Sequence, residues 1–383
     1  MVCKLCLVKI QHMTIIEVMG SRSTKYGGVE SFMYKLVADN PKATYHFIYN
    51  EYPRSEHYVK DLLSYGSSIH VINTEGIGYI RNVRKFLKLL KDIKPDVVHF
   101  HFTNAHCLWG PLCKIKGVKR VFKTMHSCLF QNGKQAGNIS EMSLQHRFIT
   151  LWGKIYGIYD RVFCVSRFVE KQHIQVYGNF GNTEISYLGT IAPKIISTEY
   201  VFNLKRKYNI DEETKVLLSI MFADPIKGCD ILIKALPNIK GKFKLLLIGM
   251  DESAGYTKLM HKLAKNIGVE DKIVWVGITD EVYKYMCISD IYIQPSRTEA
   301  LSLAAVEAMS HGLPIVATNT GGLPEVASSL FEYEDHIGLA DIVTKLLHDE
   351  IEYKKQSERS KNDWNSNFSM GNSVSRYIAL YSS

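Results

Sequence analysis

Short apolar runs rich in β-branched and aromatic residues alternate with helical patterns along most of the chain. In the first half these runs cover residues 14–19, 45–49, 68–72, 97–100, 120–124 and 161–165. In the second half they cover residues 215–220, 244–248, 273–276, 290–294 and 314–317. Helical spacing fills most of the gaps, around residues 29–39, 79–93, 226–236, 255–266 and 280–287. Such an alternation predicts an α/β fold, with doubly wound parallel sheets that carry helices on both faces.

The pattern breaks once, in the stretch Y-L-G-T-I-A-P-K-I near residues 188–200. A chain of 383 residues is long enough for two domains. We therefore predict an N-terminal Rossmann-like domain over 13–190, a C-terminal Rossmann-like domain over 200–356 and a final helix over 357–383. Doubly wound sheets bind ligands at the carboxyl ends of their strands, so two such domains that face each other should form a cleft.

The first twelve residues are apolar but short, and Lys4 and Lys9 interrupt them. They lack the core and the cleavage site of a signal peptide, and no apolar run approaches the ~20 residues that a transmembrane helix needs. Because Met13 stands just before the first strand, we interpret residues 1–12 as an extension or a misassigned start. Without an export signal, the cytoplasm is the simplest compartment. Cys3 and Cys6 have CxxC spacing but no second pair, so we expect no metal or redox site there.

The positive charge belongs to the first half of the chain. The net charge is +9, and residues 1–190 hold 25 Lys and Arg against 13 Asp and Glu. The segment 79–93 is the most basic, with apolar residues at helical spacing and Arg or Lys between them. We favour an amphipathic helix with a solvated basic face, and the alternative is a surface that is attracted to anionic lipid at the inner face of a membrane.

Two glutamates frame the stretch P-S-R-T-E-A-L-S-L-A-A-V-E-A-M-S-H-G. Glu299 and Glu307 are separated by seven residues, and between them a loop becomes a helix that begins at Ser302 as N-cap and ends at Gly312. The N–H groups and the dipole at the start of this helix favour a phosphate beside Glu299. The two carboxylates can accept hydrogen bonds from hydroxyls that flank the phosphate, as in a ribose and a hexose. Two solvated helix glutamates are the alternative interpretation.

The first domain offers two candidates at strand ends. Gly27 and Gly28 follow the first strand and precede a helix, so backbone N–H groups could approach a bound anion, although the pair could equally form a simple turn. His126 follows the run 120–124, where an imidazole would be placed in the cleft and could donate a hydrogen bond to a sugar hydroxyl. In the run D-V-V-H-F-H-F we interpret His99 as structural and His101 as a candidate for the cleft.

The order of these pieces resembles the retaining glycosyltransferases of family 4, which have the GT-B fold. The resemblance covers nearly the whole chain and is strongest over 215–327, through P-S-R-T-E-A-L-S-L, L-L-L-I-G-M, V-W-V-G-I-T-D-E and the Gly-Gly-Leu-Pro-Glu motif. It implies a final helix that crosses back to the first domain. It also implies a nucleotide-diphospho-sugar as co-substrate, with no other cofactor, no metal and no nucleic acid as partner. A glycan or a lipid-linked glycan would be the acceptor.

The resemblance also implies roles for individual residues. Glu307 would bind the ribose, Glu299 the transferred sugar and Lys227 the diphosphate, and His126 would hold the sugar. The amides of Ser302 and Leu303 would meet the phosphates, and the remaining donor-binding positions are Gly27, Gly28, Gly249, Gly277 and Ile278. Ser166 matches the serine of the family that follows the last strand of the first domain.

The chain departs from the family at the phosphate site. Many members have an arginine a few residues before Lys-Gly, but that position falls near Phe222 here. We expect Arg297 to replace it, or the helix N-terminus to suffice. Ala300 and Ser302 also stand where many members have glycine, and the Ser302 hydroxyl would be an additional donor.

Family analogy places such an enzyme in the biosynthesis of cell-surface polysaccharide. Two alternatives stay open, a nucleotide-sugar epimerase of the same fold and a non-catalytic protein that binds nucleotide sugars. We expect acceptor specificity to depend on loops of the first domain such as 131–143.

Overall fold

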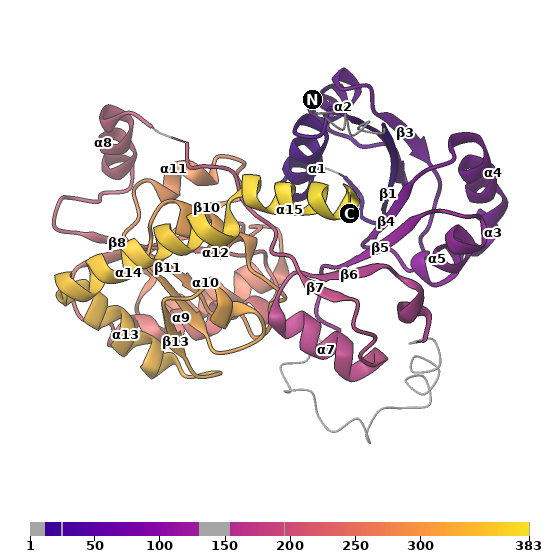
Figure 1. The fold of residues 1–383 in the computed structure, drawn as a ribbon. Coiled ribbons are helices and arrows are strands. Elements are labelled where there is room, and N and C mark those ends of the chain that lie inside the picture. The colour runs from indigo at the N-terminus through magenta and orange to yellow at the C-terminus, as the bar shows by residue number, and fades with distance from the viewer. Residues whose placement is uncertain (1–11, 24–25, 130–153, 195, 383) are drawn as a thin grey trace, which may run out of the picture.

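Two parallel sheets, each covered by helices, form the molecule (Figure 1). The computed structural model describes residues 12–23, 26–129, 154–194 and 196–382. Apart from His12, the predicted N-terminal extension lies outside these residues, as does the predicted specificity loop 131–143. None of the described helices is long and apolar enough to cross a bilayer.

The first sheet has seven strands in the order β3-β2-β1-β4-β5-β6-β7. The strands are β1 (Met13–Met19), β2 (Ala43–Tyr49), β3 (Ser68–Val71), β4 (Val97–His101), β5 (Arg120–Met125), β6 (Arg161–Cys164) and β7 (Thr183–Ile185). The helices are α1 (Gly28–Ala38), α2 (Glu56–Ser64), α3 (Gly78–Arg81), α4 (Val83–Ile93), α5 (His106–Ile115) and α7 (Arg167–Tyr177), with a 3₁₀ turn at Lys154–Ile158. The strand order reverses between β1 and β4, which pair directly, so a ligand site is expected at their carboxyl ends.

The second sheet has six strands in the order β10-β9-β8-β11-β12-β13. The strands are β8 (Lys215–Ile220), β9 (Phe243–Ile248), β10 (Ile273–Gly277), β11 (Ile291–Gln294), β12 (Ile315–Thr318) and β13 (Ser329–Phe331). The helices are α8 (Thr198–Lys207), α9 (Cys229–Ala235), α10 (Gly255–Ile267), α11 (Val282–Met286), α12 (Leu303–Ser310), α13 (His336–His348) and α14 (Glu350–Asp363). Its order reverses between β8 and β11, and the loops after these two strands carry Lys227 and Glu299.

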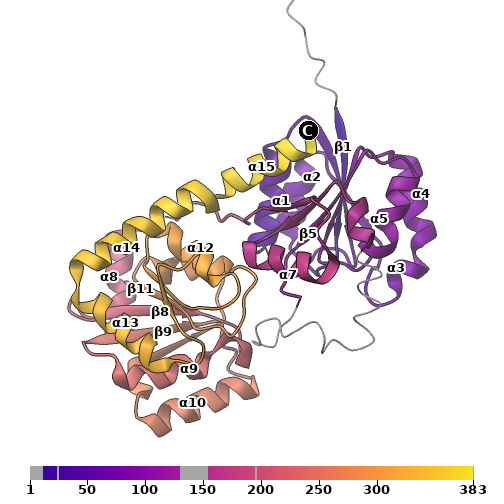
Figure 2. The same cartoon turned by 60° about the horizontal axis from the view of Figure 1, so that its bottom comes forward.

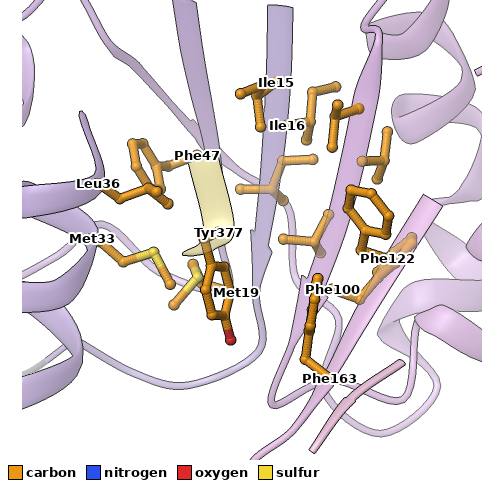
Figure 3. Close-up of a cluster of buried hydrophobic side chains, with 14 of the residues drawn as sticks. Ile15, Ile16, Met19, Met33, Leu36, Phe47, Phe100, Phe122, Phe163 and Tyr377 are labelled. Atoms are coloured by element: carbon orange, nitrogen blue, oxygen red, sulfur yellow. The ribbon is translucent and has the colours of Figure 1, made fainter. Parts of the chain in front are cut away.

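The C-terminal segment crosses from the second domain to the first, as Figures 1 and 2 show. Sequence predicts one helix here, whereas the structure has α14 on the second domain, a π-helical segment at Trp364–Phe368 and then α15 (Met370–Ser382). Tyr377 and Tyr381 of α15 are fully buried in the core of the first domain. Figure 3 shows Tyr377 inside this cluster, where its ring stacks on that of Phe163 with centroids 4.9 Å apart.

All eleven predicted strands are present, with ends shifted by no more than two residues. The sequence pattern missed β7 and β13, because three residues at a sheet edge are too few to form an apolar run. It also joined α3 and α4, which the structure separates at Asn82. The central strands were recognised because they are buried on both faces, and every residue of β4 is buried.

Candidate active site between the two domains

Lys227 and Glu299 form an ion pair at the carboxyl edge of the second sheet. The distance from Lys227 Nζ to Glu299 Oε1 is 2.5 Å, and the two side chains are 16% and 13% exposed. Ser296 Oγ donates a second hydrogen bond to Glu299 Oε1 at 3.0 Å. The Lys227 ammonium also lies over the Phe222 ring, 4.7 Å from its centroid. The structure thus brings together two of the predicted catalytic residues, which are 72 positions apart in sequence.

Two glycines make this approach of loops sterically feasible. Gly228 has a φ of +69°, and a Cβ at that position would stand 2.0 Å from the carbonyl oxygen of Pro295. Gly321 has a φ of +59°, and its Cβ would stand 2.2 Å from the carbonyl oxygen of Glu299. Only glycine fits such a conformation and contact. The Lys-Gly and Gly-Gly motifs therefore hold the Glu299 loop between them.

The helix α12 begins as the sequence predicts. Ser302 is its N-cap, and its Oγ accepts a hydrogen bond from the N–H of Ala305 at 3.2 Å. The same hydroxyl donates to Gln294 Oε1 at 2.9 Å. The expectation that the Ser302 hydroxyl is an additional donor for a phosphate is therefore wrong in this conformation, because its proton is already committed to Gln294.

Glu307 lies farther along α12 and remains free to accept hydrogen bonds. Its carboxylate makes no ion pair within the part of the chain that the structure describes. Burial raises its pKa above the ordinary value, and the distant charge of Lys194 lowers the pKa in partial compensation. A half-buried carboxylate without a cation favours donors such as sugar hydroxyls.

Two of the glycines predicted to bind the nucleotide contact each other at the ends of neighbouring strands. The N–H of Gly249, after β9, donates to the carbonyl oxygen of Gly277, at the end of β10, with a distance of 2.7 Å. The next residue, Ile278, is 71% exposed, which is unusual for an isoleucine and leaves its side chain open to a ligand.

Loops of the first domain approach this edge from the other side. A Cβ on Gly28 would lie 3.4 Å from Leu303 Cδ1, so the start of α1 faces the start of α12. Thr298 Oγ1 lies 3.7 Å from Cys128 Sγ, two residues after His126. Predicted residues of the two domains therefore approach one another at this edge. The backbone N–H of Gly27 already has a partner, because it donates a hydrogen bond to Glu30 Oε2 at 3.1 Å.

His126 stands at the end of a buried chain of hydrogen bonds. Its Nε2 lies 2.9 Å from His101 Nδ1, and His101 Nε2 lies 3.0 Å from Glu17 Oε2. Burial lowers the pKa of both histidines, so both rings are neutral at pH 7. Because the Glu17 carboxylate can only accept, His101 carries its proton on Nε2 and His126 carries its proton on Nε2 as well.

This assignment leaves His126 Nδ1 as a lone pair without a partner among the described residues. The sequence-based expectation was a donor to a sugar hydroxyl. In the structure Nδ1 is an acceptor without a partner in the described part of the chain, and it is itself buried, with the ring stacked on Phe102 at a centroid distance of 3.8 Å. The placement of His101 also differs from expectation, because it is 1% exposed and lies behind His126 rather than in the cleft. His99 is structural as predicted, with hydrogen bonds to Thr124 and Tyr381.

Glu17, His99 and His101 also have the composition of a metal site, with ligand atoms within 4.8 Å of one another. Their nitrogen and oxygen atoms already hold hydrogen bonds to each other and to Thr124, His126 and Tyr381. A metal ion would have to displace this network, so the cluster is better suited to positioning His126.

Two family profiles match the chain in succession. The profile described as Glycosyltransferase Family 4 matches residues 26–189, and the profile described as Glycosyl transferases group 1 matches residues 201–363. The chain belongs to the family 4 glycosyltransferases. The gap between the two matched ranges coincides with the break in the sequence pattern near residues 188–200.

Several relatives of this family 4 glycosyltransferase are similar over different lengths. The N-acetyl-alpha-D-glucosaminyl L-malate synthase of Bacillus anthracis is 31% identical over 185 residues, 46% of this chain and 48% of that protein. The chain thus spans about half the length of this relative. An uncharacterized glycosyltransferase of Methanocaldococcus jannaschii is 25% identical over 342 residues, which cover 88% of this chain and 89% of that protein.

A solved structure confirms the GT-B fold. HepE from Anabaena in complex with UDP superposes with a TM-score of 0.79 at 18% identity, covering 97% of this chain and 100% of that chain. The same protein has also been solved with UDP-glucose.

At the phosphate site predicted from the sequence, Arg297 is engaged by two carboxylates. Its guanidinium binds Asp230 through two hydrogen bonds, at 2.9 and 3.0 Å, and binds Glu334 at 2.6 and 3.1 Å. These two carboxylates satisfy its charge, so Arg297 fixes the loop before Glu299 instead of meeting a phosphate. Lys227 is then the cation that stands beside Glu299.

The sequence did not reveal a role for Glu325 of the Gly-Gly-Leu-Pro-Glu motif. Its carboxylate accepts hydrogen bonds from the N–H groups of Arg167 and Phe168, at 3.0 and 3.2 Å, and from Tyr187 Oη at 2.7 Å. It therefore caps α7 of the first domain from the second domain. Ser166 is the N-cap of this helix. An acidic residue three positions after a Gly-Gly pair gave no local signal, because its partners lie about 140 to 160 residues away.

Proposed function

We propose that this glycosyltransferase moves a sugar from a nucleotide-diphospho-sugar to an acceptor hydroxyl with retention of configuration and without a metal. The observation that carries the proposal is the Lys227–Glu299 pair, which faces the His126 loop across the cleft. A cation and a carboxylate in contact suit a substrate in which a sugar hydroxyl lies next to a diphosphate.

In this mechanism the donor binds to the second domain. Glu307 accepts hydrogen bonds from the ribose and Glu299 accepts one from the transferred sugar. Lys227 turns from Glu299 toward the diphosphate and, with the amides at the start of α12, stabilises the negative charge that develops on the leaving group. An acceptor hydroxyl attacks from the same face, with a phosphate oxygen of the leaving group as base. His126 holds the sugar.

Calorimetric titration with UDP, GDP, ADP and CMP tests the donor site. The complexes of HepE with UDP and UDP-glucose support beginning with the uridine nucleotide. We expect one diphosphate to bind selectively and its affinity to fall in Glu307→Gln, whereas Glu332→Gln on the same domain should bind like the wild type. If no nucleotide binds, the proposed donor site is wrong.

The product tests the reaction itself. Transfer from the matching nucleotide sugar should continue in EDTA, and proton NMR of the first product should show the anomeric configuration of the donor. An inverted product, or an absolute need for a divalent ion, would contradict the mechanism. Binding without transfer to any acceptor would favour a non-catalytic protein that binds nucleotide sugars. The ion pairs of Arg297 with Asp230 and Glu334 also fit this alternative, because they leave one fewer cation for the diphosphate.

We further propose that the protein works at the cytoplasmic face of a membrane in the assembly of cell-surface polysaccharide. Support comes from five exposed basic side chains of α3 and α4, none of which forms an ion pair with another described residue: Arg81, Arg84, Lys85, Lys88 and Lys91. Sedimentation with liposomes tests this role. Anionic vesicles should bind more protein than neutral ones, and binding should fall with salt. Equal binding to both would contradict it.

A further inference from the structure

A buried lysine occupies the middle of the first sheet. Lys123 lies on β5, between Phe100 of β4 and Val162 of β6, at a position where parallel sheets usually hold an apolar residue. Its side chain is 5% exposed. The described partner of its ammonium is the carbonyl oxygen of Thr103, at 3.4 Å, which is a weak hydrogen bond.

No carboxylate compensates this charge within the described residues. Lys123 forms no ion pair there, and burial lowers its pKa to about 8. Among the described residues, the neighbouring groups whose pKa the charge of Lys123 lowers include no carboxylate; they are the thiol of Cys107 and the histidines His99, His101, His106, His126 and His173. An isolated buried ammonium is costly, so its presence indicates a ligand that supplies the missing negative charge.

Lys123 borders a cavity of the first domain whose lining includes Cys128, which lies next to Thr298 of the second domain. The cavity has a volume of about 520 Å³, and its lining includes Lys123, His106, Cys107, Tyr156, His126 and Ser127. Its described lining contains no aspartate or glutamate. Lys123 supplies the positive charge of this described lining, because burial keeps His106 and His126 neutral.

We infer that this cavity binds a carboxylate or phosphate group carried by the acceptor. The identification of the ligand as the acceptor rests on the proposed transfer reaction, whereas the anion site rests on Lys123 and the cavity. The anionic group pairs with the Lys123 ammonium in a charge-assisted hydrogen bond. The rest of the acceptor extends past His126 toward the cleft, where its reacting hydroxyl meets the donor sugar.

Thermal unfolding and calorimetry of the full chain with small anions test the site. The probes are malonate for a carboxylate and inorganic phosphate for a phosphate, at constant ionic strength, with glycerol as the uncharged control. We expect one of the two anions to raise the Tm of the wild type and glycerol to have no effect. The anion that binds more tightly identifies the acceptor chemistry.

Three variants assign the effect to Lys123. In Lys123→Met the anion should bind at least ~10-fold more weakly, whereas the exposed control Lys116→Met should bind like the wild type. Lys227→Met controls for anion binding at the donor site and should leave the effect intact. Without ligand, Lys123→Met should have a Tm at least as high as the wild type, because it removes an uncompensated buried charge.

Three results would overturn the inference: no response of the wild type to either anion, an equal response in Lys123→Met, or a lower ligand-free Tm in that variant. The last result would mean that Lys123 has a structural partner. The test also separates the two proposals. If anions bind through Lys123 but no nucleotide binds, the proposed transfer reaction is wrong and the anion site stands. If a nucleotide binds but no anion binds through Lys123, the acceptor binds elsewhere.

Discussion

The hydroxyl of Tyr381 donates a hydrogen bond to Glu17 Oε1 at 2.8 Å, which joins two residues 364 positions apart. Glu17 stands on the first strand of the protein and Tyr381 on its last helix, and both are fully buried. The other oxygen of the same carboxylate accepts from His101, which in turn binds His126. The C-terminal helix therefore supports the residue that sets the proton positions at the cleft.

Removal of this hydroxyl should destabilise the protein. Tyr381→Phe removes the hydrogen bond to Glu17 Oε1 and the acceptor of the Nδ1–H of His99, while Glu17 Oε2 keeps its bond to His101. This loss should cost about 1–3 kcal/mol of unfolding free energy. Urea denaturation should show a lower midpoint with an unchanged m-value. Tyr377→Phe is the matched control and should cost less, because its hydroxyl meets Thr124 at 3.2 Å. An unchanged midpoint in Tyr381→Phe would mean that the hydrogen bond contributes no stability.

Loss of either member of the Lys227–Glu299 ion pair should impair the proposed transfer. Lys227→Met and Glu299→Gln should each reduce turnover by ~10²-fold or more, if each side chain supplies a few kcal/mol at the transition state. Initial rates at saturating donor measure the effect. Lys234→Met removes a more exposed lysine that pairs with Asp230 on the same domain and should retain activity. Full turnover in Lys227→Met would exclude the role proposed for that lysine.

Gly228→Ala should disturb both stability and the site. The positive φ costs about 1–2 kcal/mol for any residue with a Cβ, and the clash with the Pro295 carbonyl adds to this cost. Gly268→Ala isolates the first effect, because Gly268 has a φ of +77° with open space around its Cβ position. We expect Gly268→Ala to lose only the backbone cost and keep its activity. Similar losses of stability in both variants would show that the loop at Pro295 can move to accommodate the additional Cβ without a measurable cost.

Acid should destabilise the protein through its buried histidines. Burial lowers the pKa of His106 to about 3 and that of His173 to about 4, whereas the unfolded chain binds protons near pH 6.5. Since the unfolded state binds more protons, this stability is present above pH 6.5 and is lost as the pH falls toward 4. Each residue should contribute a loss of about 2 kcal/mol between pH 7 and pH 5.

Variants can assign this pH dependence. His173→Phe should flatten the decline of unfolding free energy between pH 7 and pH 5, while the ring contact with Tyr156 is retained. The exposed control His57→Gln should leave the profile unchanged. The same decline in His173→Phe as in the wild type would mean that other groups cause it.

Local rules predicted much of the second domain. The Ser302 cap, the helix after it and the glycines around Glu299 follow from residues that lie close together in sequence, so the position of Glu299 and Glu307 could be read in advance. The fate of Arg297 could not, because its partners Asp230 and Glu334 lie 67 and 37 positions away. A predicted phosphate ligand became a structural ion pair for this reason.

The sequence by itself determined the alternating α/β order, the two sheets and the residues at most strand ends. Strands that are buried on both faces consist of continuous apolar residues, which can be recognised locally. Only the tertiary structure decided which polar atoms are left free to act. Hydrogen bonds and ion pairs depend on contacts between distant segments. These contacts commit Ser302 and Arg297, while they leave Glu307 and Lys123 without an ion-pair partner among the described residues. The chemistry of the cleft is set by those free groups.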